Sequence, residues 1–218
     1  MWRQVEEKYD LINCIGCSAH GFNLIISDIV KIDVIKNVIR FAQAIVKEIR
    51  DSPLRLAKYR ESDDATELKY AVKTRWYSYV EMLQSVTRNK NVIWNLALND
   101  NLRNETNIKN ATDEKFWEKV NFVIAVLKPI TNAIAEIEGD KTFLSSVVVS
   151  YKRMKALIFE NIKPFTTTEQ TQIQHILNQR ENFLLHPIHY LSNVLDPNFE
   201  GKSLDENEHQ SALRLLQQ

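Results

Sequence analysis

The chain has 218 residues, of which 44% are hydrophobic and 26% charged, a composition typical of a globular domain that excludes a disordered or collagen-like chain. Its 28 basic residues balance its 28 acidic residues, so it lacks the positive charge of an autonomous nucleic-acid binder, and any DNA contact must be local. Its two cysteines, Cys14 and Cys17, are too close together to staple a secreted fold, which favours a reducing, intracellular compartment. Charged residues interrupt the most apolar stretch, 21–49, so we expect no membrane span.

The first predicted elements follow from the spacing of apolar residues. Residues 11–18 form a short apolar run that predicts a buried strand. Over residues 21–49, apolar side chains recur in steps of three and four, which predicts one long amphipathic helix. Pro53 ends this helix, because the residue before a proline disfavours helical geometry, and the chain then restarts.

The middle of the chain alternates between helix and loop signals. A second apolar stripe predicts a helix that Thr74 can cap, with the residues Trp76, Tyr79, Leu83 and Val86. Residues 99–112 are rich in asparagine and predict an exposed loop. The cleanest helical pattern covers 116–137 and ends at Gly139, where a left-handed residue is easily placed; Pro129 lies inside it and removes one helical hydrogen bond.

The last third of the chain predicts several shorter helices. One covers 144–158, with Lys155 interrupting its apolar stripe, and another opens at a capping box in residues 167–170. A short element lies between Pro187 and Pro197, and residues 205–208 open a last helix. The chain is therefore predicted to be mainly α-helical, a bundle of six to eight helices with at most one or two short strands near the N-terminus.

The spacing of Cys14, Cys17 and His20 allows three interpretations. A structural zinc site needs four ligands, and the fourth would have to be His186 or His189. A thiol enzyme would need a base that contacts the thiolate and a third group that orients the base, and neither an orienting group nor an oxyanion element is evident nearby. Buried structural cysteines beside a satisfied histidine are the simplest alternative. We expect no metal and no cofactor.

The segment Lys73-Thr74-Arg75-Trp76-Tyr77 places two cations beside two large aromatic side chains. Guanidinium and ammonium groups can hold phosphate while an indole ring stacks on an unpaired base. The alternative is a core tryptophan with solvated basic neighbours, since Trp76 also begins an apolar stripe. The acidic residues Glu136, Glu138 and Asp140 are typical of a solvated helix end rather than of a two-metal site.

Several segments, in order over residues 11–199, resemble hAT-superfamily transposases, in the subgroup of BED-zinc-finger transposase-derived proteins. The segments are Cys17-Ser18-Ala19-His20-Gly21-Phe22-Asn23-Leu24 followed by Asp28, Thr74-Arg75-Trp76-Tyr77-Ser78, Leu127-Lys128-Pro129-Ile130, Glu136-Ile137-Glu138-Gly139-Asp140 with Leu144-Ser145, and His186-Pro187-Ile188-His189 with Leu195-Asp196-Pro197. In that family, an RNase H-like core is interrupted by a helical insertion, and three acids bind two metal ions for DNA strand transfer.

The resemblance implies the following domain organisation. Residues 1–24 would be a remnant of the RNase H-like core, 25–98 and 113–218 the two parts of the helical insertion with its C-terminal flank, and 99–112 an exposed loop. The family's first two acids would precede Met1, and its Ser-Glu-Arg segment with the third acid does not occur before Gln218. We therefore expect a non-catalytic transposase fragment or domesticated remnant.

The resemblance also implies the binding residues and partners. The family's Arg-Trp motif contacts distorted DNA ends, and its Cys-x-x-His motif helps to position DNA, so the expected DNA-binding residues are Lys73, Arg75, Trp76, Cys17 and His20. A nuclear location follows from the same resemblance. Expected partners are DNA, contacted weakly, and another copy of the chain or a related protein, although the family's dimerisation region has no counterpart here. The alternatives are a helical protein-interaction scaffold without a DNA role and, second, a Cys17/His20 enzyme.

Overall fold

The computed structural model describes residues 14–72, 75–98, 110–139 and 142–217, together with residues 8, 12 and 108. In this part of the chain there are ten α-helices, one 3-10 helix and no strand, so the mainly helical prediction is confirmed. The predicted strand over 11–18 is wrong where the chain is described. Residues 14–17 are neither helix nor strand, and Ser18 already begins a helix.

The predicted single helix over 21–49 is two helices, α2 (Ser18–Ile29) and α3 (Asp33–Asp51). The break lies at Ile32, whose backbone is extended at φ −61° and ψ 128°, and Lys31 and Ile32 close short turns on Asp28 and Ile29. Ile29 and Ile32 are both buried. Apolar residues therefore continue to recur every three or four positions across the turn. For this reason the sequence pattern did not reveal the break between the two helices. The β-branched residues around it lower the local helical preference.

The chain restarts at Pro53, as expected, with α4 (Pro53–Arg60), whose first turn is capped by the Ser52 hydroxyl accepting from the Arg55 amide at 3.4 Å. An extended segment then leads to α5 (Trp76–Arg88) and α6 (Lys90–Leu98). Asn89 lies between these two helices and is fully buried. Its side chain accepts from the Thr66 amide at 2.8 Å and donates to the Thr66 hydroxyl at 2.9 Å, which fixes the extended segment against α5.

The end of the predicted loop is packed into the core. Most of 99–112 lies outside the described residues, so the exposed loop stays a prediction there, but Ile108 and Ala111 are buried. A 3-10 helix (Asn110–Thr112) leads into α8 (Glu114–Ile137), and the Trp117 indole donates to the Ala111 carbonyl at 2.8 Å. The helix runs through Pro129. Gly139 follows α8 without a positive φ, so the expected left-handed residue is not formed.

The remaining helices are α9 (Ser146–Asn161), α10 (Thr167–Leu184), α11 (Pro187–Leu195) and α12 (Glu206–Leu216). The capping box of α10 pairs Thr166 with Glu169, one residue earlier than predicted, because the side chain that caps must precede the first helical residue. The last helix begins as predicted, with Asp205 and Glu208 forming its capping box.

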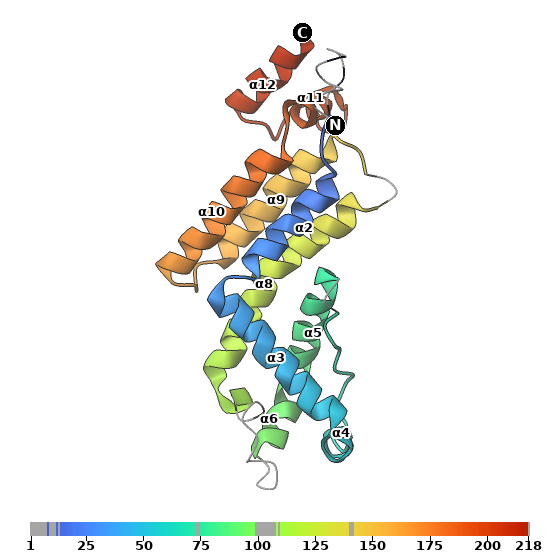
Figure 1. Cartoon of the computed structure of the whole chain (residues 1–218), viewed down its shortest axis with the longest axis vertical. Helices are drawn as coiled ribbons and strands as arrows, with labels where there is room; N and C mark the ends of the chain where they lie inside the picture. Colours follow the sequence, from blue (N-terminus) through green and yellow to red (C-terminus); the bar gives the residue numbers. More distant parts are fainter. Residues whose placement is uncertain are drawn as a thin grey trace.

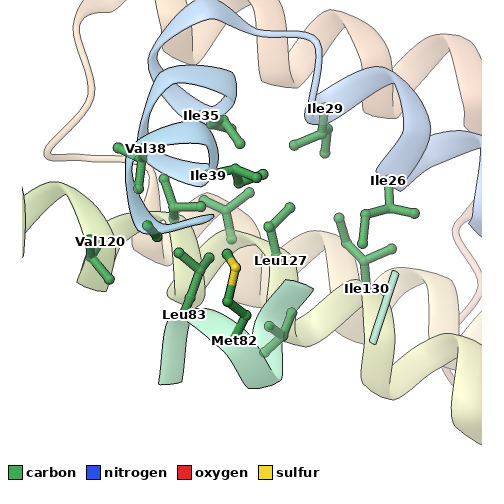
Figure 2. Close-up of a cluster of buried hydrophobic side chains, with 14 of the residues drawn as sticks. Ile26, Ile29, Ile35, Val38, Ile39, Met82, Leu83, Val120, Leu127 and Ile130 are labelled. Carbon is green, nitrogen blue, oxygen red and sulfur yellow. The ribbon is translucent and has the colours of Figure 1, made fainter. Parts of the chain in front are cut away.

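Figure 1 shows an elongated molecule in which α8 runs through two groups of helices. Its N-terminal half packs with α3, α5 and the 3-10 helix, and its C-terminal half with α2 and α9, which are joined by α10. Figure 2 shows the buried side chains where α2, α3, α5 and α8 meet, among them Ile29, Ile39, Leu83 and Leu127. Helix α8 is therefore the common scaffold of both groups.

Within the described residues, α8 is also the one helix long and apolar enough to cross a membrane. This property rests on length and composition, and core helices of soluble proteins share it. The apolar side of α8 is covered by other helices of the chain, with Trp117, Val123 and Leu127 buried.

Two contacts fix α2 against α10. Gly21 is buried, and a Cβ placed on it would lie 2.5 Å from a methyl carbon of Leu184, so the glycine allows a close approach of the two helices. Asp28 accepts from the Arg180 Nε at 2.8 Å and from Lys31 at the same distance. Burial alone would raise the pKa of Asp28, but the bonds from Lys31 and Arg180 outweigh it and lower that pKa.

Candidate nucleic-acid interface

A hollow of about 520 Å³ lies between the start of α5, helix α2 and the C-terminal half of α8. It is lined by Asn23, Arg75, Trp76, Tyr77, Thr131, Ile134, Ala135 and Glu138. The hollow therefore joins two segments that the sequence singled out separately, the one that contains Asn23 and the one that contains Arg75 and Trp76.

The geometry at the start of α5 follows from Ser78. Its hydroxyl accepts from the Val72 amide at 2.7 Å and donates to the Arg75 carbonyl at 2.6 Å, which fixes the extended backbone that enters the helix. Arg75 therefore precedes the first turn with its side chain exposed, and Tyr77 is 57% exposed. Trp76 is half-buried, with its ring centroid 5.6 Å from that of Tyr79. Trp76 both packs on the core and borders the hollow.

A second hollow of about 450 Å³ lies on the other side of Arg75 and Tyr77, which line both. Its other two basic side chains are engaged: the Arg50 guanidinium lies 4.5 Å from the Tyr70 ring centre, and Lys69 pairs with Glu81 at 2.5 Å. Hydrogen bonding to Asp51 raises the pKa of Tyr70, and this keeps its hydroxyl protonated. None of the described side chains pairs with the Arg75 guanidinium. Among the described residues that line the two hollows, Arg75 is thus the cation left available to an anionic ligand.

Cys17 and His20, two of the other expected DNA-binding residues, are not among the residues that line the hollow. Cys17 immediately precedes α2 and His20 lies in its first turn, and both side chains are exposed. Neither cysteine forms a disulfide. Lys73 lies outside the described residues. The structure therefore joins Arg75 and Trp76 to one hollow and leaves Cys17 and His20 on a neighbouring surface.

His189 lies against the segment that contains Cys17 and His20. Its Nε2 is 3.5 Å from the Ser18 hydroxyl, and its Nδ1 accepts from the His186 amide at 3.1 Å. Because an amide can only donate, Nδ1 carries no proton and Nε2 does, so the ring donates to Ser18. Burial, reinforced by the nearby His186, lowers the pKa of His189 to about 4. His189 is a neutral bridge between α2 and α11.

The described residues contain no group of three or more His, Cys, Asp or Glu side chains placed to hold a metal ion. Cys14, Cys17 and His20 thus have no complete set of zinc ligands around them in this part of the chain. His189, one of the two histidines named as a fourth ligand, does lie near this segment, beside Ser18.

Comparison with known proteins gives one match. The family model described as the ZBED1 RNase-like helical domain matches residues 15–126, just over half of the chain. The chain belongs to this family. No curated protein and no solved structure matches. The ZBED1-type match runs from the segment before α2 into α8 and includes Cys17, His20, Asn23, Arg75 and Trp76, which supports the transposase-derived, helical part of the resemblance.

Segments that carry the resemblance are far apart in the ZBED1-type chain but contact one another in the fold. Asn23 lines the same hollow as Arg75 and Trp76. Ser145 donates to Asp196 at 2.6 Å, and its carbonyl accepts from the buried Asn193 side chain at 2.8 Å. The hydrogen bonds from the Ser145 hydroxyl and from the Asn198 amide lower the pKa of Asp196. The sequence offered no signal for these pairings, because they depend on the path of the chain.

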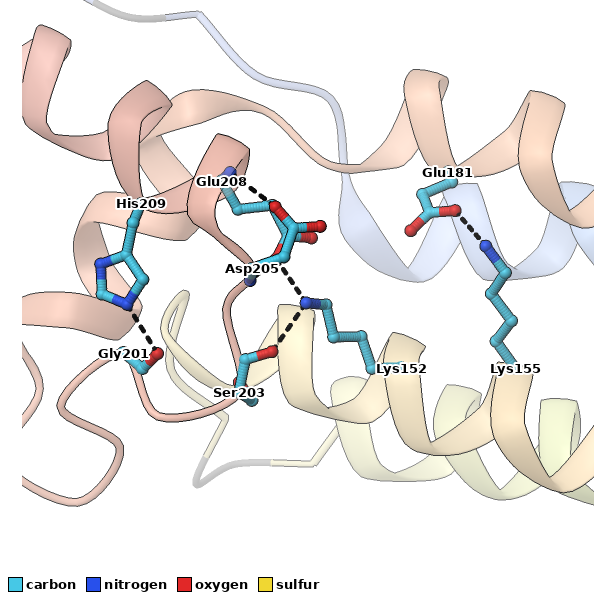
Figure 3. Close-up of polar contacts among 8 residues, drawn as sticks. All are labelled: Lys152, Lys155, Glu181, Gly201, Ser203, Asp205, Glu208 and His209. Atoms are coloured by element: carbon cyan, nitrogen blue, oxygen red, sulfur yellow. Dashed lines mark hydrogen bonds and ion pairs between the residues drawn. The ribbon is translucent and has the colours of Figure 1, made fainter.

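Many acidic side chains of the ZBED1-type chain form separate ion pairs. Figure 3 shows two of them, Lys155 with Glu181 at 2.5 Å and Lys152 with Glu208. The position of Lys155 in an apolar stripe, unexplained by the sequence, is accounted for by this pair. Glu136 pairs with Arg153, and Asp140 lies outside the described residues. No pattern in the sequence indicated that Thr131 would line the hollow. Glu138 lies at an exposed helix end, as predicted, but it also lines the hollow.

Proposed function

We propose that this ZBED1-type domain contacts DNA at the hollow beside α5 and does not itself catalyse strand transfer. The observation that supports DNA contact is the shared lining of this hollow by Arg75, Trp76 and Tyr77, a cation and two aromatic side chains. The guanidinium would hold a backbone phosphate, and the Trp76 ring would stack on a base that has left the duplex, worth about 1 to 3 kcal/mol per base.

The first experiment compares Trp76→Ala with Trp94→Ala. Both tryptophans are half-buried and pack against the core, but Trp94 lies on α6, away from the hollow. We expect Trp76→Ala to weaken binding to a hairpin with one unpaired base by about tenfold, the lower range of a lost stack. Trp94→Ala should keep that affinity. Fluorescence anisotropy measures binding, and thermal melting measures folding.

The comparison has two informative outcomes. If Trp76→Ala binds the hairpin more weakly than Trp94→Ala does while the two variants melt at similar temperatures, Trp76 has a binding role. If both variants lose the same affinity, and each loss follows the decrease in that variant's melting temperature, Trp76 belongs to the core alone. This outcome would favour a protein-interaction scaffold.

The proposal that the domain is non-catalytic is supported by the engagement of its carboxylates. Asp28, Glu81, Glu181 and Glu208 each pair with a lysine or an arginine. A two-metal mechanism needs several carboxylates that converge on one pocket. We expect no Mg²⁺- or Mn²⁺-dependent nicking of a labelled hairpin by the purified chain. Nicking that disappears when one of its acidic residues is neutralised would overturn this proposal.

The location and partners belong to the same proposal. The resemblance to BED-zinc-finger transposase-derived proteins supports a nuclear location, and a related protein or a second copy of the chain as the partner that supplies further DNA contacts. The Cys17/His20 enzyme stays the least supported alternative, because neither residue lines the hollow.

A further inference from the structure

We infer that the hollow beside α5 prefers an unpaired base that carries an exocyclic amino group, and that Glu138 reads this group. The inference rests on the proposed DNA contact and adds a base preference to it. It comes from the distribution of hydrogen-bond donors and acceptors around the hollow, which differs between its two sides.

The polar groups that α2 and α8 contribute are mainly acceptors. The Asn23 amide nitrogen donates one of its two N–H groups to the Ala19 carbonyl at 2.9 Å, and its Oδ1 can accept. The Thr131 hydroxyl donates its proton to the Lys128 carbonyl at 3.0 Å, so only its lone pairs remain. The ionised carboxylate of Glu138 accepts and cannot donate.

The start of α5 has the opposite character. Arg75 supplies donors and a positive charge there, and Trp76 and Tyr77 supply ring faces. Glu138 is exposed at the C-terminal end of α8, where the helix dipole is negative, so this side of the hollow attracts donors and repels phosphate. A nucleotide would therefore bind with its phosphate at Arg75 and the edge of its base toward Glu138.

This arrangement distinguishes among the bases. Cytosine, adenine and guanine carry amino groups that donate to a carboxylate, as glutamate and aspartate accept from the cytosine amino group in DNA grooves. Uracil and thymine present carbonyl oxygens at the corresponding position, which a carboxylate repels. The sharpest comparison is between unpaired dC and dU, because these bases have nearly the same shape. They differ at position 4, an amino group in cytosine and a carbonyl in uracil, and at the neighbouring N3, which carries a proton only in uracil.

The experiment measures affinity for two hairpins that differ only in one unpaired nucleotide, dC or dU. We expect the chain to bind the dC hairpin about fivefold or more tightly than the dU hairpin, the lower limit for one discriminating pair. Glu138→Gln should reduce this ratio to near one, because an amide both donates and accepts. Glu160→Gln, which removes an exposed carboxylate from the end of α9, should leave the ratio unchanged.

The outcomes separate this inference from the proposed function. Equal binding of the dC and dU hairpins, or an unchanged ratio in Glu138→Gln, overturns the base preference while DNA contact stands. Failure to bind either hairpin overturns both. An unchanged far-ultraviolet circular dichroism spectrum and melting temperature of Glu138→Gln would show that any effect is not a folding defect, as expected for an exposed residue.

Discussion

At the scale of the residue, protonation of His189 is coupled to the stability of the folded chain. It is fully buried and neutral, and it bridges the Ser18 hydroxyl and the His186 amide. A second proton would have to sit on Nδ1, where the His186 amide already points. The cost of protonation is therefore both desolvation and the loss of a hydrogen bond, which agrees with the lowered pKa of about 4.

This bridge predicts a fall in stability on acidification. An unfolded histidine takes up its proton near pH 6.5, whereas the folded chain resists it until about pH 4. The contribution is fully present above pH 6.5 and is lost as the pH falls toward 4, because the unfolded state binds more protons in this window. Between pH 7 and 4.5 the free energy of unfolding should drop by about 2 kcal/mol from this group.

Urea titrations at the two pH values measure this drop, with His189→Gln and His20→Gln as the variants. The neutral His189→Gln should lose less stability on acidification than the wild-type chain does. His20→Gln removes an exposed histidine and should retain the wild-type pH dependence. An identical drop in the wild type and in His189→Gln would show that His189 is not the group responsible.

The chemistry of single residues could be predicted where it is local. Arg75 and Trp76 were identified because a cation next to an aromatic ring is visible in the sequence, and the structure places both at one hollow. The partner of His189 could not be predicted, since Ser18 is 171 positions away. The sequence also could not show that Thr131 acts as an acceptor at the hollow, because this depends on the group to which its hydroxyl donates.

At the scale of the element, helix signals were reliable where a side chain marks the end. Ser52 with Pro53 and Asp205 with Glu208 stop or start helices as predicted, since capping is a contact between near neighbours. The break between α2 and α3 was missed because no such signal marks it. Ile29 and Ile32 remain buried on both sides, so the apolar period continues across a turn.

The break has a consequence for the candidate site. It lets α2 lie along α10 and the C-terminal half of α8, while α3 packs with α4, α5 and the N-terminal half of α8. Asn23 on α2 and Arg75 at the start of α5 then meet over α8. A single straight helix over 21–49 could not serve both groups of helices in this way, so the turn at Ile32 is a condition for the hollow.

At the scale of the whole molecule, charge is balanced overall and largely paired locally. The chain carries 28 basic and 28 acidic residues, and the described ion pairs are spread over both groups of helices, as Lys69 with Glu81 on α5 and Lys155 with Glu181 between α9 and α10 show. Such a molecule has no long-range field that attracts DNA. Affinity must then come from a few contacts at one place. At the hollow, Arg75 is a cation that pairs with none of the described side chains.

This balance predicts a shallow but definite salt dependence of hairpin binding. Each neutralised phosphate contributes a slope of about −0.7 to −0.9 in a plot of log affinity against log salt concentration. One to three contacts should therefore weaken binding by about 3- to 40-fold between 50 and 200 mM salt. Anisotropy titrations over this range measure the slope.

Arg75→Gln should reduce the magnitude of this slope by the contribution of about one phosphate contact. Arg60 is an exposed arginine on α4, and Arg60→Gln should leave the slope unchanged. An affinity for the hairpin that does not change with salt would contradict phosphate contact at the hollow, because apolar contacts are not screened.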